Sequence, residues 1–385
     1  MRYIKLKEHN RKICGLPFLS NIPLRCLVLH LVLVFGAAIL AGDAWMLKAG
    51  GFINSRLPET YPLVERFIRW DAHWYTYIAQ QGYDQLSIVF FPMLIMWIRL
   101  VAPFFNFDYG LAGFVVCNIF SVLCFFLLYA LFRLDFSETV ADKALLAFAV
   151  MPSSVFLNSI YTEPLFLTFS LACVYFARTG RWWRAGLCAA LATLTRNLGI
   201  FLICLMAWEY WEQGRRGKCT PTRTAPILAL PLLAFAGFIY YNYWLLGQPL
   251  AFVEMQTAWG REFSPPWVNI WRGVLLVGQG AGTAAILDLI LVLLTLAGLV
   301  AMTFRRTLPI PRSYLIIGWL WFLVPLCSTA AWMPLYSMAR FVLVIFPLYL
   351  YVAQLQPSRY RSLIMLGAVT TAICSVLFTN WFWLG

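Results

Sequence analysis

The chain has 385 residues, of which 62% are hydrophobic and only 12% are charged. This composition excludes an ordinary water-soluble enzyme, a disordered chain and a small disulfide-bonded protein, because none of these can hold so many apolar side chains. About eleven apolar segments of roughly 20 residues would accommodate them in a bilayer. The sequence therefore predicts an all-α polytopic membrane protein with about 11 transmembrane helices.

Residue usage also limits the available chemistry. The ten cysteines fall in apolar segments or basic loops, so we expect no structural disulfide. With three histidines and no acidic cluster, the sequence predicts no metal site. It has no P-loop and no glycine-rich dinucleotide turn, so we expect no cofactor and no nucleotide-sugar chemistry. The net charge of +13 then indicates membrane sidedness and not nucleic-acid binding.

Taken in chain order, the first apolar run, 24–47, follows a basic stretch and is too long for a cleaved signal. We expect it to be an uncleaved first span with a cytoplasmic N-terminus. The remaining apolar segments are 88–105, 110–132, 143–157, 164–178, 185–212, 225–246, 284–304, 313–331, 337–355 and 361–383.

Two of these segments are ambiguous, and the distribution of basic residues decides between their alternatives. Segment 88–105 contains Arg99 and could span or lie in the interface, while 185–212 is interrupted near Arg196. If the first stays outside and the second is a hairpin turning at Arg196, 20 of the 29 lysines and arginines lie on the inner side. Because inner loops are enriched in these residues, this arrangement is preferred and gives eleven spans.

This topology predicts one integral membrane domain over 1–385 with two long outer loops, 48–109 and 247–283. Three short outer turns lie at 158–163, 195–197 and 332–340. These five outer segments hold the polar residues that could carry chemistry on the extracytoplasmic side.

The first outer loop contains an aromatic stretch that begins at Arg69. At helical spacing Trp70, Trp74 and Tyr77 share one face, which predicts an interfacial helix. The simplest interpretation is an aromatic belt in which Arg69 and Asp71 are solvated. Asp71 gains interest because other charged residues are expected on the same side of the membrane.

Three charged residues stand next to or within apolar segments. Glu163 either reaches a polar cavity or caps the helix beginning at Pro164. Arg340 either requires a partner in a polar cavity or extends its side chain to the membrane interface. Arg196, inside a stretch of 28 residues, requires an anionic partner, which is either a carboxylate such as Glu163 or Asp71 or a lipid phosphate. We expect the phosphate.

In the second long loop, Gln256, Trp259 and Glu262 are suited to sugar binding, although a surface amphipathic helix would also explain them. Two carboxylates and two arginines thus map to one membrane face. This set suits transfer of a group from a lipid phosphate, in which a carboxylate deprotonates a hydroxyl and arginine neutralises the phosphate.

Several of these residues lie in motifs that resemble the PIG-V family, which comprises GPI mannosyltransferase II and its bacterial relatives. The matching motifs are Arg69-Trp70-Asp71, Ile78-Ala79, Gly82-Tyr83, Phe90-Phe91-Pro92, Tyr161-Thr162-Glu163, Leu194-Thr195-Arg196 and Ser337-Met338-Ala339-Arg340-Phe341. They run from about residue 66 to 350 in the family's order.

The resemblance implies a GT-C-type helical bundle and an inverting glycosyltransferase. Such an enzyme moves mannose, or a related hexose, from a polyprenyl-phosphate-sugar donor to an extracytoplasmic lipid or glycan acceptor, with Asp71 as general base. The expected substrate-binding residues are Arg69, His73, Tyr161, Glu163, Arg196, Gln256, Trp259 and Arg340. Nothing identifies a GPI acceptor, so we expect a relative in a bacterial inner membrane.

Two other classes of protein would also need buried charges. A transporter or lipid flippase should show paired broken helices in two related halves, and no such symmetry is visible in the sequence. In a non-catalytic scaffold subunit, the common location of Asp71, Glu163 and Arg196 would be accidental.

Overall fold

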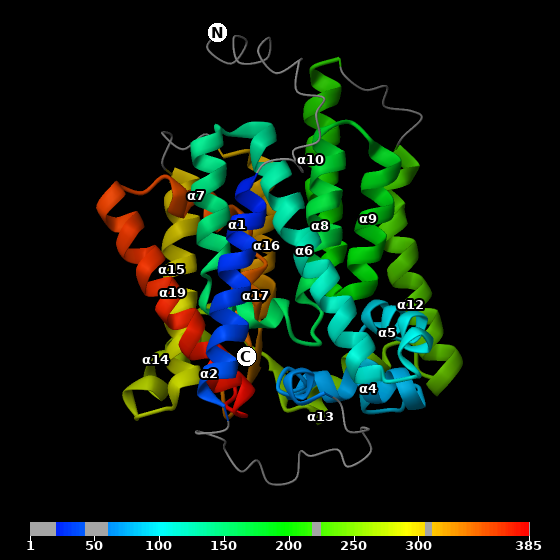
Figure 1. The fold of residues 1–385 in the computed structure, drawn as a ribbon. Coiled ribbons are helices and arrows are strands. Elements are labelled where there is room, and N and C mark those ends of the chain that lie inside the picture. The colour runs from blue at the N-terminus through cyan, green and yellow to red at the C-terminus, as the bar shows by residue number, and fades with distance from the viewer. Residues whose placement is uncertain (1–20, 43–60, 218–224, 305–309, 385) are drawn as a thin grey trace.

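The computed structural model describes residues 21–42, 61–217, 225–304 and 310–384, and most of these residues are helical. The longer helices run side by side between the two ends of the molecule, the upper and lower ends of Figure 1. In the described part, the helices long and apolar enough to cross a membrane are Ile22–Ala41, Tyr109–Asp135, Ile227–Leu246, Thr283–Phe304 and Pro357–Thr379. A helical membrane protein is thereby confirmed, while the count of eleven spans stays a prediction.

The first half of the chain forms helices of very different lengths, from the three-residue η4 to the 27-residue α6. They are α1 (Asn21–Leu31), η3 (Val32–Gly36), α2 (Ala37–Ala41), α3 (Pro62–Glu65), α4 (Asp71–Gln81), η4 (Ser87–Val89), α5 (Pro92–Val101), η5 (Ala102–Phe105), α6 (Tyr109–Asp135), α7 (Glu138–Ala149), η6 (Pro152–Leu157) and α8 (Glu163–Arg178). Proline occupies the first or second position of α5 and α8, where its missing N–H costs no hydrogen bond.

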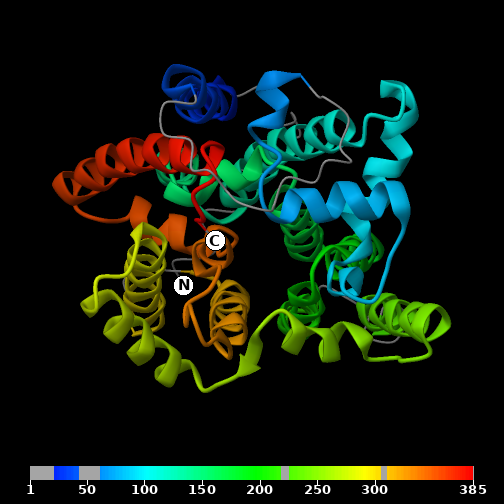
Figure 2. The same ribbon diagram turned by 90° about the horizontal axis from the view of Figure 1, so that it is seen from below.

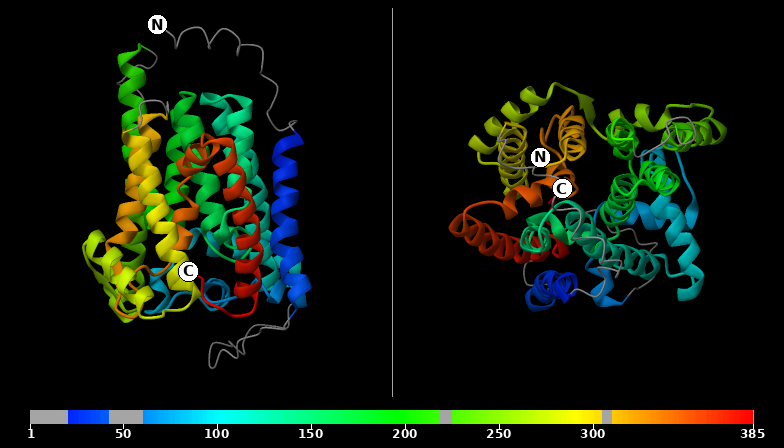
Figure 3. Two further views of the ribbon diagram at one scale, coloured as in Figure 1. Left: turned by 90° about the vertical axis from the view of Figure 1, so that its left-hand side faces the viewer. Right: turned by 90° about the horizontal axis from the view of Figure 1, so that it is seen from above.

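The second half adds more helices and two short strands. They are α9 (Trp182–Thr195), η7 (Asn197–Phe201), α10 (Leu202–Arg215), η8 (Ala225–Ala229), α12 (Leu230–Leu246), α13 (Ala251–Ala258), β1 (Arg261–Phe263), α14 (Pro266–Gly278), α15 (Thr283–Phe304), α16 (Arg312–Leu326), β2 (Ser328–Ala330), α17 (Met338–Leu343), α18 (Pro347–Ala353) and α19 (Pro357–Thr379). Figure 3 shows α1 at the edge of the bundle.

Segment 88–105 does not form a long helix. It divides into η4, α5 and η5, and α5 has only 10 residues. That is about 15 Å, half of what a bilayer requires. With α4 and α13, α5 lies at the lower end of the molecule, where α4 runs crosswise to the long helices (Figure 1). This geometry agrees with the prediction that the segment does not span.

The interruption predicted at Arg196 is present. Helix α9 ends at Thr195 and α10 begins at Leu202, with η7 between them. Gly199 permits this turn, since a Cβ there would lie 2.4 Å from the backbone nitrogen of Thr193. The hairpin assignment for 185–212 is therefore confirmed.

Three other predicted segments, 143–157, 313–331 and 337–355, are not continuous helices. The first divides into α7 and η6, and the third into α17 and α18. The second ends as a helix at Leu326 and continues into β2, which pairs antiparallel with β1. The expectation of an all-α fold missed this sheet, because strands of three residues leave no periodic pattern. Seen from below, β1 joins the side of the molecule that holds α12 and α13 to the side with α14 and α15 (Figure 2).

Helix α8 is the centre of the bundle. Its first twelve residues are all buried, and it packs against α6 on one side and α9 on the other. Because it runs the length of the core, its N-terminal Glu163 and C-terminal Arg178 lie at opposite ends of the molecule, about 22 Å apart along the helix axis.

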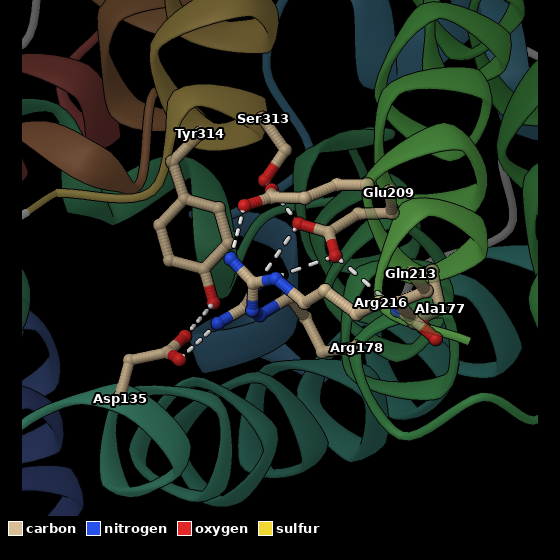
Figure 4. Close-up of polar contacts among 9 residues, drawn as sticks. Asp135, Ala177, Arg178, Glu209, Gln213, Arg216, Ser313 and Tyr314 are labelled. Carbon is tan, nitrogen blue, oxygen red and sulfur yellow. Dashed lines mark hydrogen bonds and ion pairs between the residues drawn. The ribbon is translucent and has the colours of Figure 1, made fainter. Parts of the chain in front are cut away.

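A polar network joins α6, α8, α10 and α16 at the upper end (Figure 4). Arg178 contacts Asp135 and donates to Glu209 Oε1 over 3.0 Å. The Ser313 hydroxyl donates to the same Glu209 oxygen over 2.6 Å, and the Tyr314 hydroxyl donates to Asp135 over 2.9 Å. The network therefore fixes α8 at the end remote from Glu163.

Candidate active site

A pocket of about 350 Å³ lies at the lower end of the bundle. Every one of the five segments predicted to share the outer membrane face contributes to its wall. In chain order, one lining residue from each segment is Asp71, Thr162, Arg196, Arg261 and Arg340. Convergence of five distant segments on one pocket is what the charge-based topology predicts.

Four charged side chains form a continuous chain of ion pairs at the pocket. Arg340 donates from Nη1 to Asp71 Oδ2 over 2.6 Å and from Nε to Glu163 Oε1 over 2.7 Å. Arg196 donates from Nη1 to the same Glu163 oxygen, also over 2.7 Å. Arg340 therefore bridges both carboxylates, and Glu163 bridges both arginines.

These residues all come from the ends of helices that stop at the pocket. Asp71 is the first residue of α4 and Glu163 the first of α8, positions at which the helix dipole favours a carboxylate. Arg196 directly follows α9, and Arg340 lies in the six-residue α17. The local helix boundaries thus bring the charged groups together.

Backbone strain accompanies two of these elements. Trp70 and Ser337 have φ of 54° and 65°, which non-glycine residues seldom adopt. Each is the residue that immediately precedes α4 or α17. Trp70 packs edge-on against Trp381 and Trp383, with ring centroids 5.8 and 5.1 Å apart, so the C-terminal segment supports this conformation.

Exposure distinguishes the two carboxylates. The side chain of Asp71 is 19% exposed and lines the pocket, whereas that of Glu163 is 0% exposed and does not. Arg340 also stacks over the Tyr161 ring at 4.4 Å, and Arg196 over the Phe341 ring at 4.7 Å. Asp71 can therefore reach a ligand, while Glu163 holds the arginines in place.

Three predicted binding residues, Arg69, His73 and Tyr161, lie behind the pocket wall. Arg69 donates to backbone carbonyls, including Thr379 O at 3.1 Å, and Tyr161 donates to Arg69 O at 3.2 Å. His73 stacks on Trp381. Burial, with a smaller effect of Arg69, lowers the pKa of His73 to about 4, so its imidazole is neutral near pH 7 and a weak proton acceptor.

Of the three residues of the second long loop that are suited to sugar binding, Gln256 and Trp259 line the pocket, whereas Glu262 is exposed in β1 and does not. The Trp259 indole donates to Leu86 O over 3.1 Å and packs edge-on against Trp74 and Phe90, with centroids 5.3 and 5.6 Å apart. Phe90 and Trp259 thus give the pocket an apolar wall, and Gln256 lies in α13 about one helical turn before Trp259, the residue that follows this helix.

Arg196 contacts one of the two partners that the sequence allowed, the carboxylate of Glu163. The reason is that η7 turns Arg196 back beside the first residue of α8. Binding of a lipid phosphate by Arg196 stays a prediction. Arg196 still lines the pocket, with 9% of its surface exposed.

Two residues of the site were missed at the sequence level. Arg261 lines the pocket but was counted only as one outer charge. Asp288 is buried within α15 and accepts a 2.6 Å hydrogen bond from the backbone N–H of Ala339 at the start of α17. An acid inside an apolar span was the signal that could have identified Asp288.

The sequence of this chain matches the model of the mannosyltransferase (PIG-V) family over residues 22–256. The chain belongs to this family. Among curated relatives, GPI alpha-1,6-mannosyltransferase 2 of Mus musculus is 33% identical over 237 residues, covering 52% of this chain and 47% of that protein. GPI mannosyltransferase 2 of Cryptococcus neoformans var. neoformans serotype D (strain JEC21) is 30% identical over 196 residues, 46% of each chain. The chain thus spans about half the length of the curated relatives it matches.

Among solved structures, similarity extends to the Archaeoglobus fulgidus oligosaccharyltransferase. Its apo form gives a TM-score of 0.49 at 15% identity, with 95% of this chain and 57% of that chain covered. The form tethered to an acceptor peptide gives 0.45 at 13% identity, with 94% and 55% covered. The family assignment rests on the sequence match.

Proposed function

We propose that this PIG-V family member transfers a mannosyl or related hexosyl group from a polyprenyl-phosphate-sugar to a hydroxyl of a lipid or glycan acceptor. The observation that carries the proposal is the position of Asp71, a partly exposed carboxylate that lines the pocket while Arg340 holds one of its oxygens at 2.6 Å. A fixed carboxylate beside a cationic pocket suits deprotonation of a hydroxyl near a phosphate.

In the proposed reaction Asp71 accepts the proton of the acceptor hydroxyl. The acceptor oxygen forms a bond to the anomeric carbon while the bond from that carbon to the phosphate oxygen breaks. The electron pair leaves with the polyprenyl phosphate, and a single displacement inverts the anomeric centre. The pocket arginines stabilise the negative charge that develops on this leaving group.

The other residues take supporting roles in this proposal. Glu163 holds both Arg196 and Arg340, and the aromatic wall with Gln256 and Trp259 receives the sugar. Arg69, His73 and Tyr161 position the backbone around Asp71. We place the pocket on the extracytoplasmic side, because the membrane face that holds its five segments carries only nine of the 29 lysines and arginines, and inner loops are enriched in these residues.

The test is sugar transfer by the purified protein supplied with radiolabelled polyprenyl-phosphate-mannose and a membrane lipid extract. Asp71→Asn keeps the size of the side chain and removes its basicity, so transfer should fall by roughly 10²- to 10⁴-fold. Glu254→Gln, which changes an exposed carboxylate of α13, is the matched control and should leave transfer unchanged.

Two results would contradict the proposal. Near-normal transfer by a folded Asp71→Asn variant would remove Asp71 from the chemistry. Movement of the labelled lipid across a reconstituted bilayer without formation of a mannosylated product would favour a lipid flippase.

A further inference from the structure

The charges around the pocket do not balance. Arg196, Arg261 and Arg340 line it, whereas the carboxylates associated with these arginines are Asp71 and Glu163. Three guanidinium groups against two carboxylates leave an excess of one positive charge. A cation excess in a partly buried cavity is expensive unless a ligand supplies an anion.

The excess falls on one residue. Arg196 and Arg340 are held by carboxylates, but Arg261 forms no ion pair with any residue in the described part of the chain. Its guanidinium instead stacks 4.9 Å from the centre of the Tyr336 ring. Burial lowers the pKa of Arg261; Tyr336 and Asp71 oppose this effect, while the charges of Arg340 and Arg196 add to it, and the net shift is downward. An anion in the pocket would offset the burial and the repulsion from the two arginines.

A second polar group nearby lacks a partner. Ser337 also lines the pocket, and its buried hydroxyl makes no hydrogen bond with the residues that the structure describes. Its φ of 65° is a strained value for a serine. A buried hydroxyl without a partner costs free energy that a ligand oxygen would recover.

The backbone, and not an ion pair, holds Arg261 in place. Arg261 is the first residue of β1 and pairs with Ala330 of β2. The segments on either side of this sheet come from different sides of the molecule (Figure 2). The pairing keeps the guanidinium at the pocket when it is not bound to an anion.

We infer that Arg261, assisted by the Ser337 hydroxyl, binds the phosphate ester of the lipid donor. The inference rests on the proposed function. A sugar phosphodiester carries one negative charge, which equals the excess at the pocket. The same group becomes the leaving phosphate, so Arg261 can bind the donor in the ground state and stabilise the product anion as the bond breaks.

The experiment measures binding separately from transfer. The full chain in detergent is titrated with farnesyl phosphate, farnesol and inorganic phosphate, and binding is followed by calorimetry. Arg261→Gln should weaken farnesyl phosphate binding about 10- to 100-fold, and Arg261→Lys by less, since a charge remains but the planar fork is lost. Arg272→Gln, which changes an exposed arginine of α14, is the matched control and should bind normally.

The probes and variants have distinct outcomes. Farnesyl phosphate binding that exceeds binding of both farnesol and inorganic phosphate, and that requires Arg261, supports a lipid phosphate ester. Inorganic phosphate that binds as tightly as farnesyl phosphate, and equally requires Arg261, would support a free-phosphate site and overturn the lipid assignment. Unchanged affinity in a folded Arg261→Gln variant, judged by its melting temperature, would overturn the role of Arg261. Loss of binding in that variant while the wild type makes no mannosylated product would overturn the proposed function and leave this site standing.

Discussion

Asp71 and Glu163 show how similar side chains receive different roles from their surroundings. Both accept a hydrogen bond from Arg340, but only Asp71 lines the pocket. Glu163 lies at the first position of a helix whose first twelve residues are buried, and it accepts hydrogen bonds from two guanidinium groups. Its contribution is therefore to the geometry of the arginines.

Stability should reveal this difference. Glu163→Gln leaves the buried guanidinium of Arg196 without a carboxylate and leaves Arg340 with Asp71 alone, so the free energy of unfolding should fall by about 3–5 kcal/mol. Arg196→Gln should cost less, because Arg340 still pairs with Glu163 in that variant. Thermal unfolding in detergent, with Glu254→Gln as the control, measures both. A Glu163→Gln variant with an unchanged melting temperature and no transfer would instead assign Glu163 to the chemistry.

The sequence identified the charged members of this site because an ionised group beside an apolar segment requires a partner. It could not choose among partners, since that choice depends on how η7 and α17 fold back toward α8. For Arg196 the structure shows the carboxylate partner, Glu163, while its expected contact with a phosphate stays a prediction. Arg261 was missed, because an arginine in an outer loop has no such requirement until its neighbours are known.

At the scale of elements, strong local signals were predictive and weak ones were not. The polar triplet Thr195-Arg196-Asn197 and the nearby Gly199 indicated the break between α9 and α10. The break between α17 and α18 carries only Pro347 as a signal, and the sheet of β1 and β2 carries none. When neighbouring helices satisfy the backbone groups that a helix break frees, no polar residue is needed at the break. The sequence then stays apolar and the break cannot be detected in it.

Asp288 tests how one element positions another. It caps α17 through a 2.6 Å hydrogen bond to the Ala339 N–H, directly beside Arg340. Asp288→Ala should release this end of α17 and lower kcat about tenfold, as expected for loss of a cap worth about 1–2 kcal/mol. Asp288→Asn keeps an oxygen acceptor and should restore most of the rate.

Steady-state kinetics on both variants check this expectation. A positioning role predicts a fall in kcat with little change in KM for the donor. If Ala and Asn variants were equally impaired, or if Asp288→Ala behaved as the wild type, the cap would not be what orients Arg340.

On the scale of the whole molecule, the two ends have different chemistry. At the upper end, Arg178 is satisfied by Asp135 and Glu209 in a closed network (Figure 4). At the lower end, the pocket retains an arginine without a carboxylate. Helix α8 connects the two, so fixing its upper end also limits movement of Glu163. The distribution of charge in the sequence predicted which segments lie at the same end of the bundle. The partners of Arg178 could not be predicted, because the network joins four helices whose packing the sequence does not reveal.

Membrane sidedness follows from the same division and can be tested on intact cells. Gln85 and Asn106 are exposed residues that flank the short α5, and both should lie outside if α5 does not span. Single Gln85→Cys and Asn106→Cys variants should therefore both react with an impermeant maleimide, after the labelling of the unsubstituted chain is subtracted. Glu138→Cys, exposed at the opposite end near α7, should react only after the membrane is permeabilised. Labelling at only one of the two positions that flank α5 would mean that this segment crosses the bilayer, and the five segments around the pocket would then not share one membrane face.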